Sequence, residues 1–441
     1  MVRRIALISA VNPFPVDAGK KVVLAGLLEY FAYRHGADSV HYIHVGALDG
    51  GFPTAATSVP APRTGEAMWR VLSRTATGRA SLQESLLYSA GTRDGIRRAL
   101  EQLDPDTVVY DTVRMAQYAE PSGAAQQICY LDDLFSERYA AMLRTAERHP
   151  DIDIAPLGNF AGFVPPVLRP IAGHRLGWQP LLTLEQRLVR RAEDRVGSEL
   201  DRSLLISEPE ARALRTRTGL GEDRIMAIPP LLREPARRPR RPAERPEYVF
   251  LGLLSLPHND DGLRTFLSTV WPRILTAEPS ARLRIIGRSP RDGLVEAARV
   301  HADSVTLDGF VPDLAGALST ATAMVNHLRF GSGIKLKVIE ALGHGVPVVS
   351  TTIGAHGIAS GHGSGIRVAD DPESFAAHLL ELASPSANAA QSEAASAHFA
   401  RAYCRDAVIG RYDRAFAHRP ETVRSPSTTD KEASRAIAEN R

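Results

Sequence analysis

Residues 330–358, FGSGIKLKVIEALGHGVPVVSTTIGAHGI, combine glycines, basic residues and one carboxylate in a pattern that suits phosphate chemistry. Gly331-Ser332-Gly333 allows a sharp turn, and the apolar spacing after it predicts a short helix. The free N–H groups and positive dipole end at such a helix N-terminus favour a phosphate. Lys337 and Glu340 are three residues apart on this helix, so a surface ion pair between them is the structural alternative.

Two series of alternating strands and helices must position this segment. Gly343 and Gly345 end its helix, and 346–352 predicts a short central strand. The other expected strands are Arg4–Val11, Val40–Val45, Thr107–Asp111, Gln127–Leu131, Arg202–Ile206, Arg224–Ile228, Tyr248–Leu251, Arg282–Gly287, Val305–Leu307, Ala323–His327 and Ser364–Val368. The alternation predicts an α/β protein with two doubly wound parallel sheets that face each other.

Three stretches read as irregular. Gly46–Gly95 lacks clean periodicity, with loop expected around Pro53–Gly65 and helices around Glu66–Ala76 and Leu82–Ser89. Asp151–Pro180 is rich in proline and glycine, so we expect a surface loop, with acceptor or membrane-surface contacts as the alternative. Arg233–Pro246 alternates proline with arginine and is expected to be an extended, solvated linker.

The segment 330–358 resembles the donor-binding motif of the retaining glycosyltransferases of family 4, which have the two-domain GT-B fold. The resemblance lies in G-x-G-I-K-L-K-V-x-E-A-L-x-x-G-x-P-V-V-S-T-x-x-G-A-x-G. Weaker echoes are Gly252–Gly262, Pro279–Gly287 and Gly309–Leu314, and Asp17–Lys21 looks like the family's N-terminal loop. The resemblance implies a glycosyltransferase that binds a nucleoside-diphosphate sugar.

The resemblance also implies roles for individual residues. Glu340 would bond the ribose hydroxyls, the helix N-terminus would hold the diphosphate, and the backbone of Gly309-Phe310-Val311 would hold the nucleobase. His258-Asn259 replaces a basic pair that other branches use on phosphate, so Arg329 and Lys335 become the candidates for that charge. The expected donor-binding residues are Gly19, Lys20, Gly309, Phe310, Val311, Gly331, Ser332, Gly333, Leu336, Lys337, Glu340, Gly354 and Ala355.

Two positions depart from the family pattern. Many members have a glutamate eight residues before Glu340, where this chain has Ser332, and that glutamate is usually assigned to the donor sugar. A branch of the family has a G-x-G turn there, so we interpret Ser332 as branch membership. His356 replaces a common glutamate, and a structural role is the simpler interpretation of a lone loop histidine.

Acidic residues also end two strands of the first series. Tyr110-Asp111 and Asp132-Asp133 lie at the carboxyl ends of consecutive strands, where ligands bind in open parallel sheets. Asp111 or Asp133 is a candidate contact or base for the acceptor, and a helix cap is the alternative for Asp133. The expected catalytic residues are therefore Lys335, Arg329 and Asp133. Asp132-Asp133 lacks the usual D-x-D spacing for magnesium, so no metal is expected.

Composition excludes several protein classes. The 441 residues have 53 Lys and Arg against 50 Asp and Glu, a net charge of +3 that argues against a dedicated nucleic-acid binder. Two cysteines, Cys129 and Cys404, provide no disulfide framework or cysteine zinc site, so a cytoplasmic protein is expected. No segment approaches the roughly 20 apolar residues of a membrane helix, although membrane-surface contact stays open.

Together these patterns predict two domains with separate tasks. Residues 1–232 would bind the acceptor, 233–247 would link, 248–400 would bind the nucleotide-sugar, 401–418 would form a helix that crosses back, and 419–441 would be disordered. We expect transfer with retention, without metal or cofactor, to a glycan, a lipid-linked intermediate or a small natural product, through oxygen or sulfur. The alternatives are a catalytically silent GT-B scaffold or partner subunit, which Ser332 favours, and a nucleotide-sugar epimerase.

Overall fold

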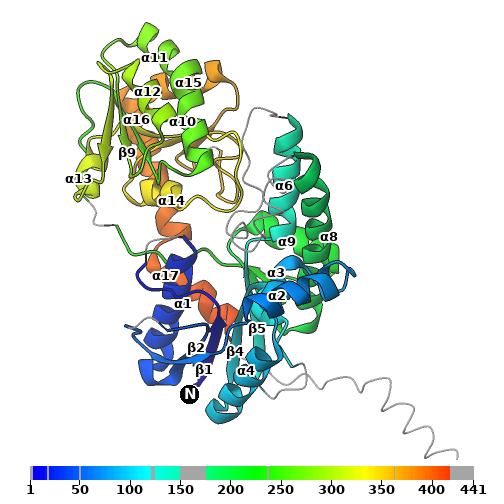
Figure 1. Ribbon diagram of the computed structural model, residues 1–441. Helices are drawn as coiled ribbons and strands as arrows, with labels where there is room; N and C mark the ends of the chain where they lie inside the picture. Colours follow the sequence, from blue (N-terminus) through cyan, green and yellow to red (C-terminus); the bar gives the residue numbers. More distant parts are fainter. Residues whose placement is uncertain are drawn as a thin grey trace, which may run out of the picture.

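The computed structural model describes residues 3–16, 19–48, 51–120, 125–148, 175–235, 238–361 and 363–417. Within them the chain forms two parallel α/β sheets, one above the other in Figure 1. Most of the Asp151–Pro180 segment, the loop residues Asp17 and Ala18, and the predicted disordered tail lie outside the described residues.

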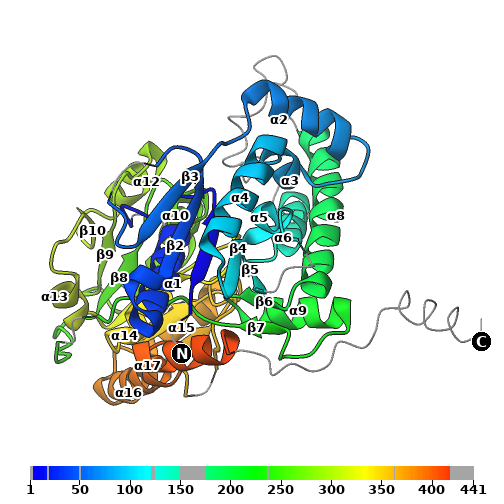
Figure 2. The ribbon, with the colours of Figure 1, turned by 90° about the horizontal axis from the view of Figure 1, so that it is seen from below.

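The first sheet has seven strands in the order β3-β2-β1-β4-β5-β6-β7, all parallel (Figure 2). They are β1 (Ile5–Ser9), β2 (Val40–Val45), β3 (Ala55–Val59), β4 (Thr107–Asp111), β5 (Gln126–Asp132), β6 (Arg202–Leu205) and β7 (Ile225–Ala227). The helices are α1 (Gly19–His35), α2 (Thr64–Arg70) with a π-helical turn over Val71–Thr75, α3 (Leu82–Leu86), α4 (Ala90–Leu103), α5 (Thr112–Ala116), α6 (Phe135–Arg148), α8 (Arg175–Glu199) and α9 (Glu208–Thr218).

The second sheet has six parallel strands in the order β10-β9-β8-β11-β12-β13. They are β8 (Glu247–Leu251), β9 (Arg282–Ile286), β10 (Val305–Gly309), β11 (Ala323–Asn326), β12 (Val348–Ser350) and β13 (Ile366–Val368). The helices are α10 (Pro257–Thr269), α11 (Trp271–Ala277), α12 (Asp292–Arg299), α13 (Leu314–Ser319), α14 (Leu336–Gly343), α15 (Pro372–Glu381), α16 (Pro385–Ala402) and α17 (Arg405–Ala415).

Alternation along buried strands builds an apolar layer on each face of both sheets. Ile5 and Leu7 of β1 pack with α1, whereas Ala6 and Ile8 pack on the opposite face with helices that include α4 and α8. β8 divides in the same way, with Tyr248 and Phe250 facing α10 and Val249 facing α14. The strand order reverses direction beside β1 in the first sheet and beside β8 in the second, which is where open α/β sheets bind ligands.

The C-terminal helices connect the two sheets. Phe399 of α16 packs in the second domain, whereas Val408 and Tyr412 of α17 pack against α1 in the first, and Figure 1 shows α17 beside α1. The Arg34 guanidinium donates two 2.7 Å hydrogen bonds to Asp413, which fixes α17 on α1. The chain therefore has two Rossmann-like domains and a C-terminal segment that crosses back, as the sequence predicts.

Four local expectations were wrong. β3 lies where a loop was expected, because it is a half-exposed edge strand with little apolar signal. Residues 175–180 are helical although Pro180 and the preceding glycines indicate a loop. The single helix expected over 401–418 is instead the end of α16 followed by α17, since the chain becomes extended at Cys404.

The fourth concerns the linker, which has no helix or strand in its described residues but is not simply solvated. The Arg240 guanidinium donates to the carbonyl oxygen of Gly345 at 2.6 Å and also to that of Ala321. The backbone N–H groups of Arg241 and Ala243 donate to Ser319 and Thr320. These contacts attach the linker to the second domain.

Candidate functional site

The carboxyl ends of β1, β4 and β5 hold a buried charge cluster in the first domain. Lys20 Nζ lies 2.5 Å from Asp111 Oδ1 and 3.2 Å from Asp132 Oδ2, and Ser9 donates a 2.6 Å hydrogen bond to Asp111. Burial opposes the charge of Lys20, but the two carboxylates outweigh it and raise its pKa. Lys20, which the sequence analysis assigned to the donor site, is thus already paired with two carboxylates. Gly19 faces the second domain, since a Cβ added to it would lie 3.8 Å from the Leu336 side chain.

Asp133 lies at the boundary between the two domains. Its Oδ2 accepts a hydrogen bond from Arg138 on α6, and its buried Oδ1 accepts none from any described residue. Glu210, on α9, accepts hydrogen bonds from the Ser207 hydroxyl and the Leu134 N–H. Burial, with the nearby charge of Asp133, raises the pKa of Glu210 to about 8. Two carboxyl groups therefore lie together beside the second domain, and their proximity favours the protonated form of Glu210.

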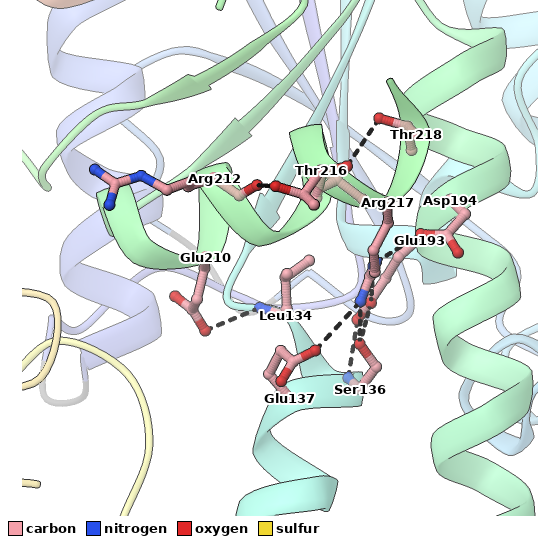
Figure 3. A network of polar contacts seen from close by, with 11 residues as sticks. Leu134, Ser136, Glu137, Glu193, Asp194, Glu210, Arg212, Thr216, Arg217 and Thr218 are labelled. Carbon is pink, nitrogen blue, oxygen red and sulfur yellow. Dashed lines mark hydrogen bonds and ion pairs between the residues drawn. The ribbon is translucent and has the colours of Figure 1, made fainter. Parts of the chain in front are cut away.

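A second polar network holds the start of α6 in place (Figure 3). The Arg217 guanidinium donates to Glu193 and to the Ser136 hydroxyl, both at 2.9 Å, and lies 2.8 Å from Asp194. Glu193 also accepts the backbone N–H of Ser136. This network joins α6, α8 and α9, so it fixes the start of α6 against the other two helices.

In the second domain, the glycine turn folds around the amino group of Lys335. Lys335 Nζ donates to the carbonyl oxygens of Ser332 at 2.9 Å and Gly333 at 2.7 Å. Gly331 and Gly333 have φ of 133° and 70°, which favour glycine, and α14 begins directly after Lys335. Burial lowers the pKa of Lys335 to about 8, although Asp133 acts in the opposite direction. Lys335 therefore supports the turn, a role that its sequence position alone does not reveal.

The other basic residues near the turn are also engaged. Lys337 Nζ donates to Asn259 at 2.9 Å and lies 3.9 Å from the centre of the Phe250 ring, so the expected partner Glu340 is not the one it uses. Arg329 forms a two-bond ion pair with Asp261. Burial, with Lys337 and Lys335, lowers the pKa of His258 to about 4, so this histidine is uncharged at neutral pH.

Glu340 is the exception among these charged groups. Its side chain is exposed, and no described residue makes a hydrogen bond or an ion pair with its carboxylate. The protein around it nevertheless raises its pKa by desolvation. An unpaired carboxylate on the first turns of α14 is available for hydroxyl groups of a ligand.

The remaining donor candidates lie around the same helix. Val311 and Leu336 pack against one apolar cluster, to which Ala355 also belongs. Gly309 has φ of 66° and accepts a 2.8 Å hydrogen bond from the Gly287 N–H, while Phe310 is 64% exposed with the Arg288 guanidinium 4.2 Å from its ring centre. Gly354 accepts from the Asn326 side chain at 2.9 Å. These contacts are structural and leave the Phe310 ring open to solvent.

The two domains touch along the glycine turn. A Cβ on Gly333 would lie 2.6 Å from Asp133 Oδ2, and one on Gly357 would lie 3.0 Å from the Ser207 Cβ. Phe330 packs on the first-domain core, and Ile334 contacts the cores of both domains. Beside these contacts lies a cavity of about 340 Å³, which includes Arg329, Ser332 and His356 from the second domain in its wall.

The sequence analysis missed several polar residues at this boundary. Arg138, Arg144 and Glu210 contribute to the cavity wall, but each is an ordinary helix residue in the sequence. Only the Ser-Glu-Pro-Glu run that begins α9 gave a local signal for Glu210, and it indicated a helix start. Among the described residues, no three His, Cys, Asp or Glu side chains lie close enough to hold a metal ion, and no helix is long and apolar enough to cross a membrane.

Comparison with known proteins links this site to a family. Residues 245–384 match the family model described as Glycosyl transferases group 1. A protein of Klebsiella pneumoniae, described as an uncharacterized 44.6 kDa protein in the cps region, is 28% identical over 139 residues. That match covers 30% of this chain and 36% of the relative, so the chain spans about a third of the relative's length.

Solved structures match over nearly the whole chain. Sucrose-phosphate synthase (tll1590) of Thermosynechococcus elongatus has a TM-score of 0.61 at 14% identity, with 93% of this chain and 98% of that one covered. Alr3699/HepE of Anabaena, solved with UDP, has 0.57 at 11% identity, with 92% and 97% covered. WaaG, a glycosyltransferase involved in lipopolysaccharide biosynthesis, has 0.55 at 13% identity, with 94% and 100% covered.

The motif, the two facing sheets and these matches agree. The second domain matches the group 1 glycosyl transferase model over residues 245–384, and the chain as a whole has the GT-B fold.

Proposed function

We propose that the chain is a retaining glycosyltransferase that holds a nucleoside-diphosphate sugar on its second domain and an acceptor on its first. The observation that carries the proposal is the arrangement around α14. A glycine turn and helix N-terminus face the first domain, and the same helix bears the Glu340 carboxylate, which no described residue pairs. This arrangement suits a diphosphate at the turn and a ribose diol at Glu340.

In the proposed reaction, the bond between the anomeric carbon and the diphosphate oxygen breaks. The acceptor oxygen or sulfur forms a bond to the same face of that carbon, and its proton passes to the departing diphosphate. The main demand on the protein is then to stabilise charge on the leaving phosphate. The N–H groups at the start of α14 are suited to this task, and Lys335 supports it by fixing the turn.

Arg329 and Asp133 take modified roles in this proposal. The Arg329 guanidinium is paired with Asp261, so it contributes charge near the turn from a fixed position. Asp133 Oδ1 is buried without a hydrogen-bond donor among the described residues, and it lies behind the glycine turn. It is suited to accept a hydrogen bond from a hydroxyl of donor or acceptor. The proposal requires no metal and no resident cofactor.

UDP is the first nucleotide to test, because Alr3699/HepE, a GT-B structure similar to this chain, was solved with UDP. A polysaccharide or lipid-linked glycan is the first acceptor class, with a small natural product second, and the proposed location is the cytoplasm. The match to a protein in a cps region and the likeness to WaaG favour a glycan acceptor.

Thermal stabilisation of the purified chain by UDP, GDP, ADP, dTDP and their sugars, with and without EDTA, tests the proposal. We expect one nucleotide to raise Tm selectively and the shift to persist in EDTA. A shift that EDTA abolishes would refute the metal-independent mechanism. Absence of any shift would refute the donor site and favour the catalytically silent scaffold, for which Ser332 is the specific observation.

A further inference from the structure

The cavity between the domains has features that define an acceptor, beyond the donor site already described. Its volume of about 340 Å³ is near the lower end for small-molecule sites, so it admits a single ring. From the first domain its wall includes one face of α6 and the start of α9, and from the second it includes the glycine turn. Because the turn is where the donor phosphates are proposed to bind, a ligand in this cavity would lie next to the reacting bond.

One face of α6 runs along the cavity and defines its inner and outer ends. Arg138, Ala141 and Arg144 line it at spacings of three, and six residues of helix span about 9 Å. Arg138 lies at the inner end, where it is bound to Asp133 against the glycine turn. Arg144 lies six residues farther along α6, at the outer end of the cavity. The separation of about 9 Å between the two positions is about the length of one sugar ring with a substituent.

The charges at the two ends differ. Arg138 is paired with Asp133, Glu137 lies 3.5 Å from Arg217, and Arg329 is paired with Asp261. Burial and the nearby Asp133 raise the pKa of Glu210, which favours the uncharged form of that carboxyl. Arg144 is exposed, and no described residue makes an ion pair or a hydrogen bond with it. Among the arginines that the structure describes in the cavity wall, Arg144 is thus the one without a carboxylate partner.

Between the ends, the wall is mostly apolar. Ala141, Ala213 and Pro209 contribute small apolar surfaces, and Phe330 and Ile353 contribute larger ones. A carbohydrate or similar ring has apolar C–H faces that pack on such surfaces, while its hydroxyls reach the polar groups at the inner end. At the inner end these polar groups include Arg138 and Ser332.

We infer that this cavity is the acceptor subsite and selects a ring-sized acceptor with one phosphate or carboxylate group, bound by Arg144 while the reacting hydroxyl lies at the glycine turn. The inference rests on the proposed function, since the donor defines which end reacts. Arg144 is a specificity residue in this arrangement and takes no part in the chemistry at the anomeric carbon.

The test is calorimetric titration of the full chain saturated with the nucleoside diphosphate that stabilises it most. The probes are glucose 6-phosphate and glucuronate, with uncharged glucose for comparison. The variants are Arg144→Gln, the matched control Arg191→Gln, and Ala141→Leu, which narrows the cavity. Arg191 is an exposed arginine on α8, outside the cavity wall, and also has no hydrogen bond or ion pair with a described residue.

We expect at least one charged probe to bind about five- to tenfold more tightly than glucose, the effect of one partly exposed charge-assisted contact. Arg144→Gln should remove that preference, Arg191→Gln should retain it, and Ala141→Leu should weaken all three probes. Nucleotide affinity should be unchanged in every variant. Failure of both charged probes to bind, or equal losses in Arg144→Gln and Arg191→Gln, would overturn the acceptor inference alone. Failure of every nucleotide to bind the wild-type chain would instead overturn the proposed function.

Discussion

Replacing Glu340 by glutamine tests whether its carboxylate binds a ligand or supports the fold. The side chain is exposed and no described residue bonds its carboxylate, so the folded protein loses no contact when the charge is removed. The raised pKa means that folding makes ionisation of Glu340 harder. Above the ordinary titration range of a carboxyl group, the charged form therefore costs stability, and Glu340→Gln should leave Tm unchanged or slightly higher at pH 7.5.

The effect on nucleotide binding should be large and in the opposite direction. A hydrogen bond to a charged group contributes about 1.5–3 kcal/mol, and each 1.4 kcal/mol is a factor of ten. Glutamine keeps one oxygen acceptor, so we expect affinity for the preferred nucleoside diphosphate to fall about tenfold in Glu340→Gln. Alanine keeps none, and the loss in Glu340→Ala should approach about a hundredfold.

Titration calorimetry with thermal denaturation of the same samples measures both quantities. Glu393→Gln is the control, because Glu393 is an exposed glutamate on α16 without a hydrogen bond or ion pair to a described residue. Equal nucleotide affinity in the Glu340 and Glu393 variants would remove Glu340 from the donor site. A clear drop in Tm for Glu340→Gln would show that the carboxylate supports the fold instead.

Three further predictions concern charges and backbone at the domain boundary. The depressed pKa of Lys335, about 8, means that the unfolded chain holds more protons than the folded one between pH 8 and the ordinary lysine pKa. The wild type should therefore gain stability with rising pH in this range, and Lys335→Met should gain up to about 3 kcal/mol less, because only Lys337 then contributes a depressed lysine pKa at the turn. Denaturant melts from pH 7 to 10.5 measure the difference, and equal gains in the two proteins would contradict the burial of Lys335. Lys20→Met leaves Asp111 and Asp132 without their cation and should cost about 3–5 kcal/mol of stability. Lys21→Met, at a half-buried site where the amino group donates to the Pro15 carbonyl oxygen, should cost about 1 kcal/mol. Equal melts of the two variants would contradict the buried ion-pair cluster. Gly333→Ala and Gly219→Ala both place a side chain at φ near 70°, which should cost about 1 kcal/mol of stability each. Only the Gly333 variant also brings its Cβ to 2.6 Å from Asp133, so it should lose about 1 kcal/mol more, the cost of disturbing a buried pair, together with nucleotide affinity. Equal stability and nucleotide affinity in the two variants would argue against the domain contact.

The sheets were predictable from sequence because most of their strands are buried. β1, β4 and β5 are apolar runs bounded by turn residues, and such runs predict the buried strands of a parallel sheet. β3 could not be found in this way, because an edge strand with half-exposed Ala, Thr and Ser has neither alternation nor an apolar run. α16 is rich in alanine and polar residues, so its helical propensity was high while its periodic signal was weak.

The site was predictable only where chemistry depends on local sequence. The glycine turn and α14 follow from consecutive residues, and they occur where the motif indicates. The partners of Lys335 and Lys337 were not predictable, because they are set by the path of the turn and by Asn259 and Phe250 from another element. Their spacing on one helix made an ion pair between Lys337 and Glu340 the structural alternative, but Lys337 instead contacts Asn259 and Phe250. The position of Glu210 and Arg144 in the cavity wall was not predictable either, because it depends on how the two domains pack.

The distribution of paired and unpaired charges distinguishes the two sides of the boundary. In the first domain, the buried carboxylates Asp111 and Asp132 have Lys20 within ion-pair distance, and Glu193 has Arg217. Such pairs compensate the cost of burial and leave little charge for a ligand. In the second domain, Glu340 has no partner among the described residues, and the turn is supported by a lysine whose amino group is bound to backbone carbonyls. Since a diphosphate and a diol need free N–H groups and a free carboxylate, this distribution of charges supports the proposed placement of the donor on the second domain.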